Sequence, residues 1–192
     1  KSDKKIYDPA KFDSYLYYTT EHKHCKCGAV DTHDESNLCS SYYPQTYKPW
    51  TDSSSLPTYG YYYLSTDVTL SKTWEITETV NLCLNGHSII ADGDFDAIKI
   101  SSSLNLTDCA PTEKQGKITH TPGTEGRGIV TEKANNYSTR LNMYGGNITG
   151  NTAENGAGIY CAAKICIRIK GGSITNNIAT GNGGGIYCEG DM

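Results

Sequence analysis

The sequence predicts an all-β protein: a right-handed parallel β-helix, a solenoid with three strands per coil, behind an irregular Cys/His-containing N-terminal segment. Three observations lead to this prediction: an internal repeat, short apolar pieces separated by Gly, Asn, Ser and Thr, and a change of composition along the 192 residues. Most of the 20 glycines lie from Gly116 onward, whereas most of the 15 tyrosines lie at or before Tyr63. The two parts of the chain are therefore built differently, and the second part is repetitive.

The repeat is clearest in the last third of the chain. The pieces Gly-Gly-Asn-Ile-Thr and Gly-Ile-Tyr-Cys, at 145–149 and 158–161, recur as Gly-Gly-Ser-Ile-Thr and Gly-Ile-Tyr-Cys at 171–175 and 185–188. Ile148 and Ile174 are 26 residues apart, and weaker copies precede them. A fixed period of this length predicts a solenoid, in which each repeat stacks on the next.

Each repeat holds three short apolar pieces rich in Val, Ile and Tyr, which favour strands, separated by Gly and Asn, which favour tight corners. Parallel strands in successive coils lie about 4.8 Å apart, so Ile148 is expected to pack against Ile174. We expect residues 1–55 to form the irregular Cys/His segment, 56–79 the N-terminal cap of the solenoid, and 80–192 its coils, which are expected to continue beyond Met192. Residues 110–115 and 131–139 are expected to bulge out as loops.

Charge and hydropathy exclude two classes of function. The chain carries 17 Lys and Arg against 21 Asp and Glu, a net charge of −4, and lacks the basic excess of a dedicated nucleic-acid binder. No stretch reaches the roughly 20 apolar residues of a transmembrane helix, so no membrane span is expected in this fragment. An even count of 8 Cys in a Tyr-rich, polar chain favours an extracellular or cell-surface location.

The pattern from Leu56 onward resembles bacterial cell-surface right-handed parallel β-helix repeat proteins, the adhesin-like members of gut anaerobes in the pectate-lyase-like superfamily. The segment His22-x-His24-Cys25-x-Cys27-Gly28 is similar to one that often precedes such repeats. The resemblance implies the fold, its hand and a secreted or surface location. It implies little about activity, because the superfamily includes lyases, tailspikes and adhesins. The matching pieces are Leu56-Pro57, 62–64, 67–70, 81–87, 116–119 and the Gly-Gly-x-Ile-Thr and Gly-Gly-Gly-Ile-Tyr repeats.

The N-terminal segment concentrates candidate metal ligands. Zinc prefers tetrahedral Cys and His ligands, and such a site would stabilise a segment with little apolar content. The expected ligands of a closed structural zinc site are Cys25, Cys27 and Cys39 with His24 or His33. Two alternatives stay open. Cys39 forms a disulfide with Cys25 or Cys27, worth about 2–4 kcal/mol, or the segment is an exposed linker.

Two further pairs of cysteines are disulfide candidates. Cys161 and Cys188 occupy the same place in successive repeats, and Cys83 and Cys109 are 26 residues apart. Stacked coils would bring the Cα atoms of each pair to about 4.8 Å, which lies within the range of disulfides. The alternative is that they stack as small apolar residues.

The chain does not show the residues of an enzyme. Lyases of this fold need a Ca²⁺ site, and the turn Asp92–Asp96 is the candidate, although alternating Asp and Gly are also typical of turns. Hydrolases need carboxylates close together, and the late coils carry few. We therefore predict no catalytic residue and a non-enzymatic protein.

The predicted function is a non-catalytic adhesin or a glycan- or protein-binding module. Its candidate binding residues are Trp50, Tyr61, Tyr62 and Trp74, because aromatic rings stack on sugars and anchor interfaces. The same rings would serve instead as the cap over the first coil. The expected partner is a glycan or a protein of a host or neighbouring cell surface. A structural stalk or self-assembling filament subunit and a fragment of a polysaccharide lyase or glycoside hydrolase are the alternatives.

Overall fold

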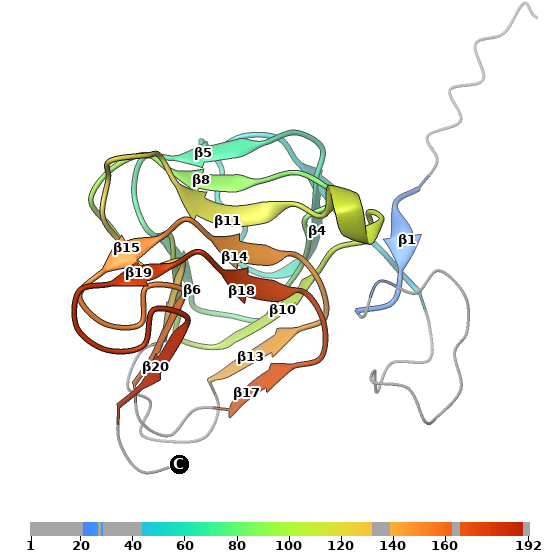
Figure 1. The fold of residues 1–192 in the computed structure, drawn as a ribbon. Coiled ribbons are helices and arrows are strands. Elements are labelled where there is room, and N and C mark those ends of the chain that lie inside the picture. The colour runs from blue at the N-terminus through green and yellow to red at the C-terminus, as the bar shows by residue number, and fades with distance from the viewer. Residues whose placement is uncertain (1–20, 27, 29–43, 132–138, 163–165, 190–192) are drawn as a thin grey trace, which may run out of the picture.

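The computed structural model describes residues 21–26, 28, 44–131, 139–162 and 166–189, and this part of the chain is nearly all β (Figure 1). It contains one 3₁₀ helix, η2 (Thr112–Lys114), in the segment predicted as a bulge, and no α-helix. Within the same residues, no helix is long and apolar enough to cross a membrane. The predicted all-β class is confirmed, while the second predicted bulge, 131–139, lies almost wholly outside the described residues.

Three parallel sheets hold most of the strands (Figure 1). The first sheet contains, in spatial order, β17 (Cys166–Ile169), β13 (Arg140–Met143), β10 (Ser103–Thr107), β7 (Val80–Cys83), β4 (Gly60–Leu64) and β3 (Lys48–Trp50). The second contains β18 (Ser173–Thr175), β14 (Asn147–Thr149), β11 (Lys117–His120), β8 (Ile89–Ala91) and β5 (Val68–Leu70). The third contains β20 (Ile186–Cys188), β16 (Ile159–Cys161), β12 (Ile129–Thr131), β9 (Ile98–Ile100) and β6 (Trp74–Ile76).

Two small ladders lie outside these sheets. Strand β15 (Thr152–Ala153) pairs in parallel with β19 (Ile178–Ala179). Strand β1 (Lys23–His24) pairs antiparallel with β2 (Gln45–Thr46) through two residue pairs. The β1–β2 ladder belongs to the N-terminal segment.

The chain visits the three sheets in turn. Strands β7, β8 and β9 belong to the first, second and third sheets, and β10, β11 and β12 then pair with them in parallel. The corner after β7 has positive φ at Asn85 (52°) and Gly86 (79°), which Asn and Gly tolerate best. The predicted stacking of Ile148 on Ile174 is confirmed, because the two residues are paired in β14 and β18.

Rows of aliphatic side chains from the three sheets form one core. In the second and third sheets, the successive pairs Ile89–Ile118 and Ile98–Ile129 are fully buried. Burying a side chain of this size stabilises the fold by about 1.5–3 kcal/mol, so the repeated column is the main source of stability. Side chains alternate between the two faces of a strand, so the residues that follow each buried isoleucine along its strand point away from the core.

The segment predicted as a cap, 56–79, carries β4, β5 and β6, which pair in register with the next strand of each sheet. Trp50 and Trp74 are buried beside each other, with ring centroids 4.7 Å apart. The indole N–H of Trp74 donates to the carbonyl oxygen of Pro57 at 2.8 Å. This burial corrects the assignment of Trp50 and Trp74 to a ligand-binding surface: both indoles are packing residues of the first layers.

Candidate metal centre

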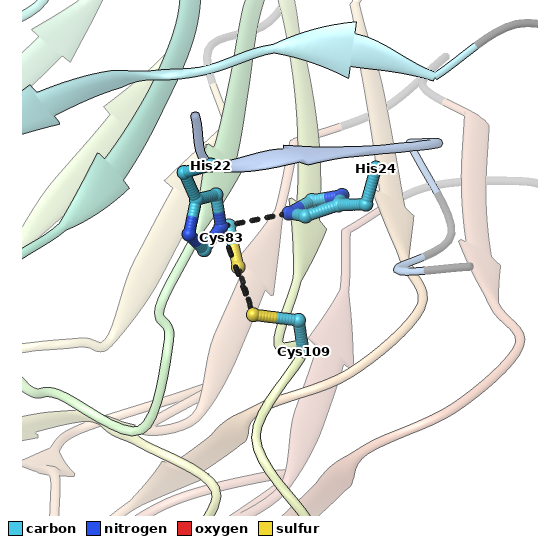
Figure 2. A group of neighbouring side chains, drawn as sticks. All are labelled: His22, His24, Cys83 and Cys109. Carbon is cyan, nitrogen blue, oxygen red and sulfur yellow. Dashed lines mark hydrogen bonds between the residues drawn. The ribbon is translucent and has the colours of Figure 1, made fainter. Parts of the chain in front are cut away.

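Four side chains from two distant parts of the chain meet beside the first sheet (Figure 2). His22 immediately precedes β1, and His24 ends it. Cys83 ends β7 and is paired with Thr107 at the end of β10, so Cys109, two residues further on, arrives at the same corner. The parallel register thus brings the two cysteines together, and the β1–β2 ladder supplies the two histidines.

The distances in this cluster fit a tetrahedral metal ion. One ligand atom from each of the four residues lies within 4.8 Å of the others. The sulfurs of Cys83 and Cys109 are 3.4 Å apart, the Nε2 atoms of His22 and His24 are 3.0 Å apart, and Cys109 Sγ lies 3.6 Å from His22 Nε2. Tetrahedral zinc with bonds of about 2.0–2.3 Å separates its ligand atoms by about 3.3–3.8 Å. The cluster can therefore hold a metal ion after small movements of its side chains.

Contacts around the imidazoles fix their orientation. His24 Nδ1 lies 2.6 Å from the carbonyl oxygen of Cys25, which accepts its hydrogen and leaves Nε2 to face the cluster. Metal-binding histidines commonly use a carbonyl in this way to set the tautomer. The ring of His22 stacks on the ring of Tyr63, with centroids 4.1 Å apart, and the centroids of the Tyr47 and His24 rings are also 4.1 Å apart. The two ligands are therefore held by neighbours before any ion binds.

Hydrogen bonds favour a thiolate at Cys109, although burial acts in the opposite direction. The hydrogen bond from Cys83 lowers the pKa of Cys109, and hydrogen bonds from His22 and His24 act in the same direction. The same bond between the sulfurs, together with burial, raises the pKa of Cys83. The pair thus tends to share one proton, with the charge on Cys109. Thiolate is the form of cysteine that binds metals.

Asp108 connects the corner after β7 to the segment after β10. Its Oδ1 accepts hydrogen bonds from the backbone N–H groups of Gly86 (3.0 Å) and Ala110 (2.9 Å), and its Oδ2 accepts one from Gly116 (2.6 Å). Burial raises the pKa of the Asp108 carboxyl, although these three donors act in the opposite direction. The side chain therefore fixes the backbone on which Cys109 stands.

Replacing Asp108 with alanine is expected to lower the free energy of unfolding by about 2–3 kcal/mol, because it leaves part-buried N–H groups without their acceptor. Any affinity of the cluster for a metal ion should also fall, since Cys109 loses its positioned backbone. Urea unfolding and zinc titration measure the two effects. Asp108→Asn is the matched control, because it keeps one acceptor oxygen and should lose less. Equal stability of Asp108→Ala and the unchanged protein would contradict this role.

The sequence-predicted ligands are only partly recovered. His24 belongs to the cluster, whereas Cys27, His33 and Cys39 lie outside the described residues. Cys25 is buried and, contrary to the prediction, contributes to the cluster through its carbonyl oxygen rather than its sulfur.

Sequence reasoning missed His22, Cys83 and Cys109 as ligands. A usable signal for His22 was the spacing His-x-His, which places both rings on one side of a strand.

The members of each cysteine pair lie in neighbouring coils or at the same corner, but the predicted disulfides are not formed. None of Cys83, Cys109, Cys161 and Cys188 takes part in a disulfide bond. The sulfurs of Cys83 and Cys109 are 3.4 Å apart, well beyond the disulfide bond length of about 2.05 Å. Cys161 and Cys188 are paired residues of β16 and β20. The stacking of Cys161 on Cys188 was thus predicted correctly, whereas Cys83 is paired with Thr107 rather than with Cys109, and neither predicted bond is formed.

Two carboxylates of the turn Asp92–Asp96 accept hydrogen bonds from the backbone of a neighbouring segment. Asp94 accepts a hydrogen bond from the N–H of Glu125, and Asp96 accepts one from the N–H of Arg127 and lies 3.3 Å from its guanidinium. Among the described residues, the His22/His24/Cys83/Cys109 cluster is the one group found that brings three or more potential ligands together. These contacts favour the turn interpretation over the predicted Ca²⁺ site.

Comparisons with protein-family models, with curated proteins and with solved structures found no significant match. The resemblance to surface β-helix repeat proteins therefore stays a prediction.

Proposed function

We propose that this chain is a right-handed parallel β-helix with three strands per coil, and that a structural zinc ion fastens its N-terminal segment to the first sheet. The cluster of His22, His24, Cys83 and Cys109 carries the proposal, because its ligands come from positions as far as 87 residues apart. Two imidazoles and two thiolates suit tetrahedral zinc, and four protein ligands fill its coordination sphere, as in structural sites.

The coil architecture is supported by the order in which the strands occupy the sheets. Three consecutive strands lie in three different sheets, and the next three pair with them in parallel. Connections between parallel strands of one sheet are right-handed in about 98% of cases, which supports the proposed hand. The stacked aliphatic core described above is what such coils require.

The zinc would add to the ring contacts and hydrogen bonds that hold the β1–β2 ladder at the first sheet. The β1–β2 ladder consists of two residue pairs, and an isolated two-stranded hairpin is marginal in water. Binding free energies of about 10–16 kcal/mol for structural zinc in small peptides become folding free energy. The ion would therefore hold the β1–β2 ladder against β7 and β10.

Elemental analysis with free-thiol counting tests the zinc proposal. We expect one zinc per chain after purification or after zinc titration, with Cys83 and Cys109 protected from thiol reagents until a chelator is added. Hydrogen exchange at the amide of Tyr47, which donates to the carbonyl oxygen of His22, should accelerate on chelation. A chain that takes up no zinc, and whose two thiols react equally with and without the metal, contradicts the proposal.

A second candidate function, glycan binding, is favoured by one pocket. A cavity of about 220 Å³ is lined by Thr46, Lys48, Gly60 and three tyrosines, Tyr59, Tyr61 and Tyr62. Tyrosine rings offer flat apolar faces for a sugar ring, and the polar groups of Lys48 and Thr46 offer hydrogen bonds. Tyr61 and Tyr62 were predicted from the sequence as binding residues.

The pocket supports the binding of a glycan; that the protein is a non-catalytic, extracellular or cell-surface adhesin whose partner is a glycan or a surface protein is our proposal from the sequence. A stalk or filament subunit that self-associates, and a lyase or hydrolase fragment, remain the alternative proposals. Size measurements at rising concentration and activity assays on polysaccharides distinguish them.

Replacing Tyr59 with alanine is expected to weaken glycan binding by about 2–12-fold, the equivalent of the 0.5–1.5 kcal/mol that an aromatic contact adds. Its side chain is 65% exposed, so the fold should be unaffected. Glycan arrays followed by titration measure the loss. Tyr187→Ala, on β20 of the third sheet, is the matched control and should bind normally. Equal binding by Tyr59→Ala and Tyr187→Ala would contradict a role for the pocket.

A further inference from the structure

The two cysteines of the metal cluster are also close enough to form a disulfide after a small movement. Their sulfurs are 3.4 Å apart, so an approach of roughly 1.4 Å would form a disulfide of about 2.05 Å. We propose that Cys83 and Cys109 form a redox-active pair, which a small organic disulfide of the glutathione class oxidises with expulsion of the metal and release of the β1–β2 ladder. This inference rests on the proposed zinc site.

The surroundings of the pair decide which sulfur reacts first. Cys83 is fully buried, whereas Cys109 is partly exposed at the corner after β10. A small disulfide therefore reaches Cys109, and Cys83 lies behind it at the distance needed to complete the exchange. The parallel pairing of β7 with β10 keeps the two sulfurs together whether or not a metal is bound.

The exchange balances without any further reagent. The thiolate of Cys109 attacks one sulfur of the small disulfide, whose S–S bond breaks and releases one small thiolate. Cys83 Sγ then attacks Cys109 Sγ in the mixed disulfide and expels the second small thiolate. Two electrons pass from the protein sulfurs to the small disulfide. In the metal-loaded protein both cysteines are thiolates; their oxidation releases the zinc, and the two departing small thiolates take protons from the solvent. In the metal-free pair, the one shared proton passes to a departing thiolate, and the solvent supplies the other.

Oxidation would separate the two halves of the metal cluster. The disulfide would keep β7 and β10 joined. The metal ion would lose its two sulfur ligands and keep only His22 and His24. Strand β1 would then depend on its two pairs with β2 and on ring contacts such as that between His22 and Tyr63. Because Thr46 of β2 lines the tyrosine pocket, the state of the cysteine pair would also act on that pocket.

The chain supplies its own comparison pair. Cys161 and Cys188 are paired residues of neighbouring parallel strands and lie outside the metal cluster. Any disulfide between them should therefore form at the same rate with and without zinc. Oxidation of Cys83 with Cys109 should instead be slower in the zinc-loaded protein, because the ion occupies both sulfurs.

The test treats zinc-loaded and zinc-free protein with glutathione disulfide, maps disulfides by mass spectrometry and follows free zinc with a chelating dye. We expect one zinc released per Cys83–Cys109 disulfide, recovery of zinc binding after reduction, and slower oxidation in the loaded protein. In His24→Ala, added zinc should no longer slow the oxidation. A zinc-bearing chain that keeps its metal, or a zinc-free chain that forms no Cys83–Cys109 bond, overturns this inference alone. A chain that binds no zinc overturns the zinc proposal with it.

Discussion

Replacing His24 with alanine is expected to abolish tight zinc binding. The Nε2 atom of His24 lies in the cluster, while its Nδ1 is held by the carbonyl oxygen of Cys25. Losing a partner outside the coordination sphere typically costs metal affinity about 10–100-fold, and losing a ligand itself should cost more than about 100-fold. Competition with a chromophoric chelator measures the zinc affinity, and elemental analysis measures the stoichiometry.

The matched control for this variant is His87→Ala. His87 lies on an exposed corner, 3.5 Å from Asp67, and is outside the cluster. Its loss should leave zinc affinity unchanged and alter stability by no more than about 1 kcal/mol, as for other surface ion pairs. If His24→Ala retained zinc as well as His87→Ala does, the ion would have to be held by other residues.

Replacing Trp74 with alanine is expected to lower the free energy of unfolding by about 3–5 kcal/mol. Its side chain is fully buried, its ring packs on Trp50, and its N–H is bonded to Pro57. For a chain of this length, the loss corresponds to a fall in melting temperature of roughly 6–20 °C. Thermal unfolding followed by circular dichroism measures it.

Two variants separate packing from binding at this end of the protein. Trp74→Phe keeps most of the buried ring but leaves the carbonyl of Pro57 without its donor, so its loss should be smaller than that of Trp74→Ala. Tyr59→Ala removes an exposed ring and should leave the melting temperature unchanged. An unchanged melting temperature in Trp74→Ala, together with lost glycan binding, would instead restore Trp74 to the ligand surface.

The stacked strands could be predicted because the repeat carries its own register. Ile148 and Ile174 stand in equivalent places 26 residues apart, and a parallel ladder pairs such residues directly. The same logic placed Cys161 opposite Cys188 and Cys83 near Cys109. The spacing does not predict the distance between the sulfurs, because that distance depends on the direction of the side chains. Both pairs are free thiols.

The metal cluster was harder to predict because half of it comes from outside the repeat. Sequence reasoning grouped His24 with its neighbours Cys25 and Cys27, whereas the structure joins it to cysteines from β7 and the segment after β10. The period of the repeat does not predict how the N-terminal segment packs on the first sheet, because that segment lies outside the repeat.

The zinc K-edge X-ray absorption spectrum of the metal-loaded protein tests the central claim most directly. Coordination by His22, His24, Cys83 and Cys109 predicts two sulfur ligands at about 2.3 Å and two imidazole nitrogens at about 2.0–2.1 Å. A first shell of three or four sulfurs, or one of nitrogen and oxygen alone, would contradict it.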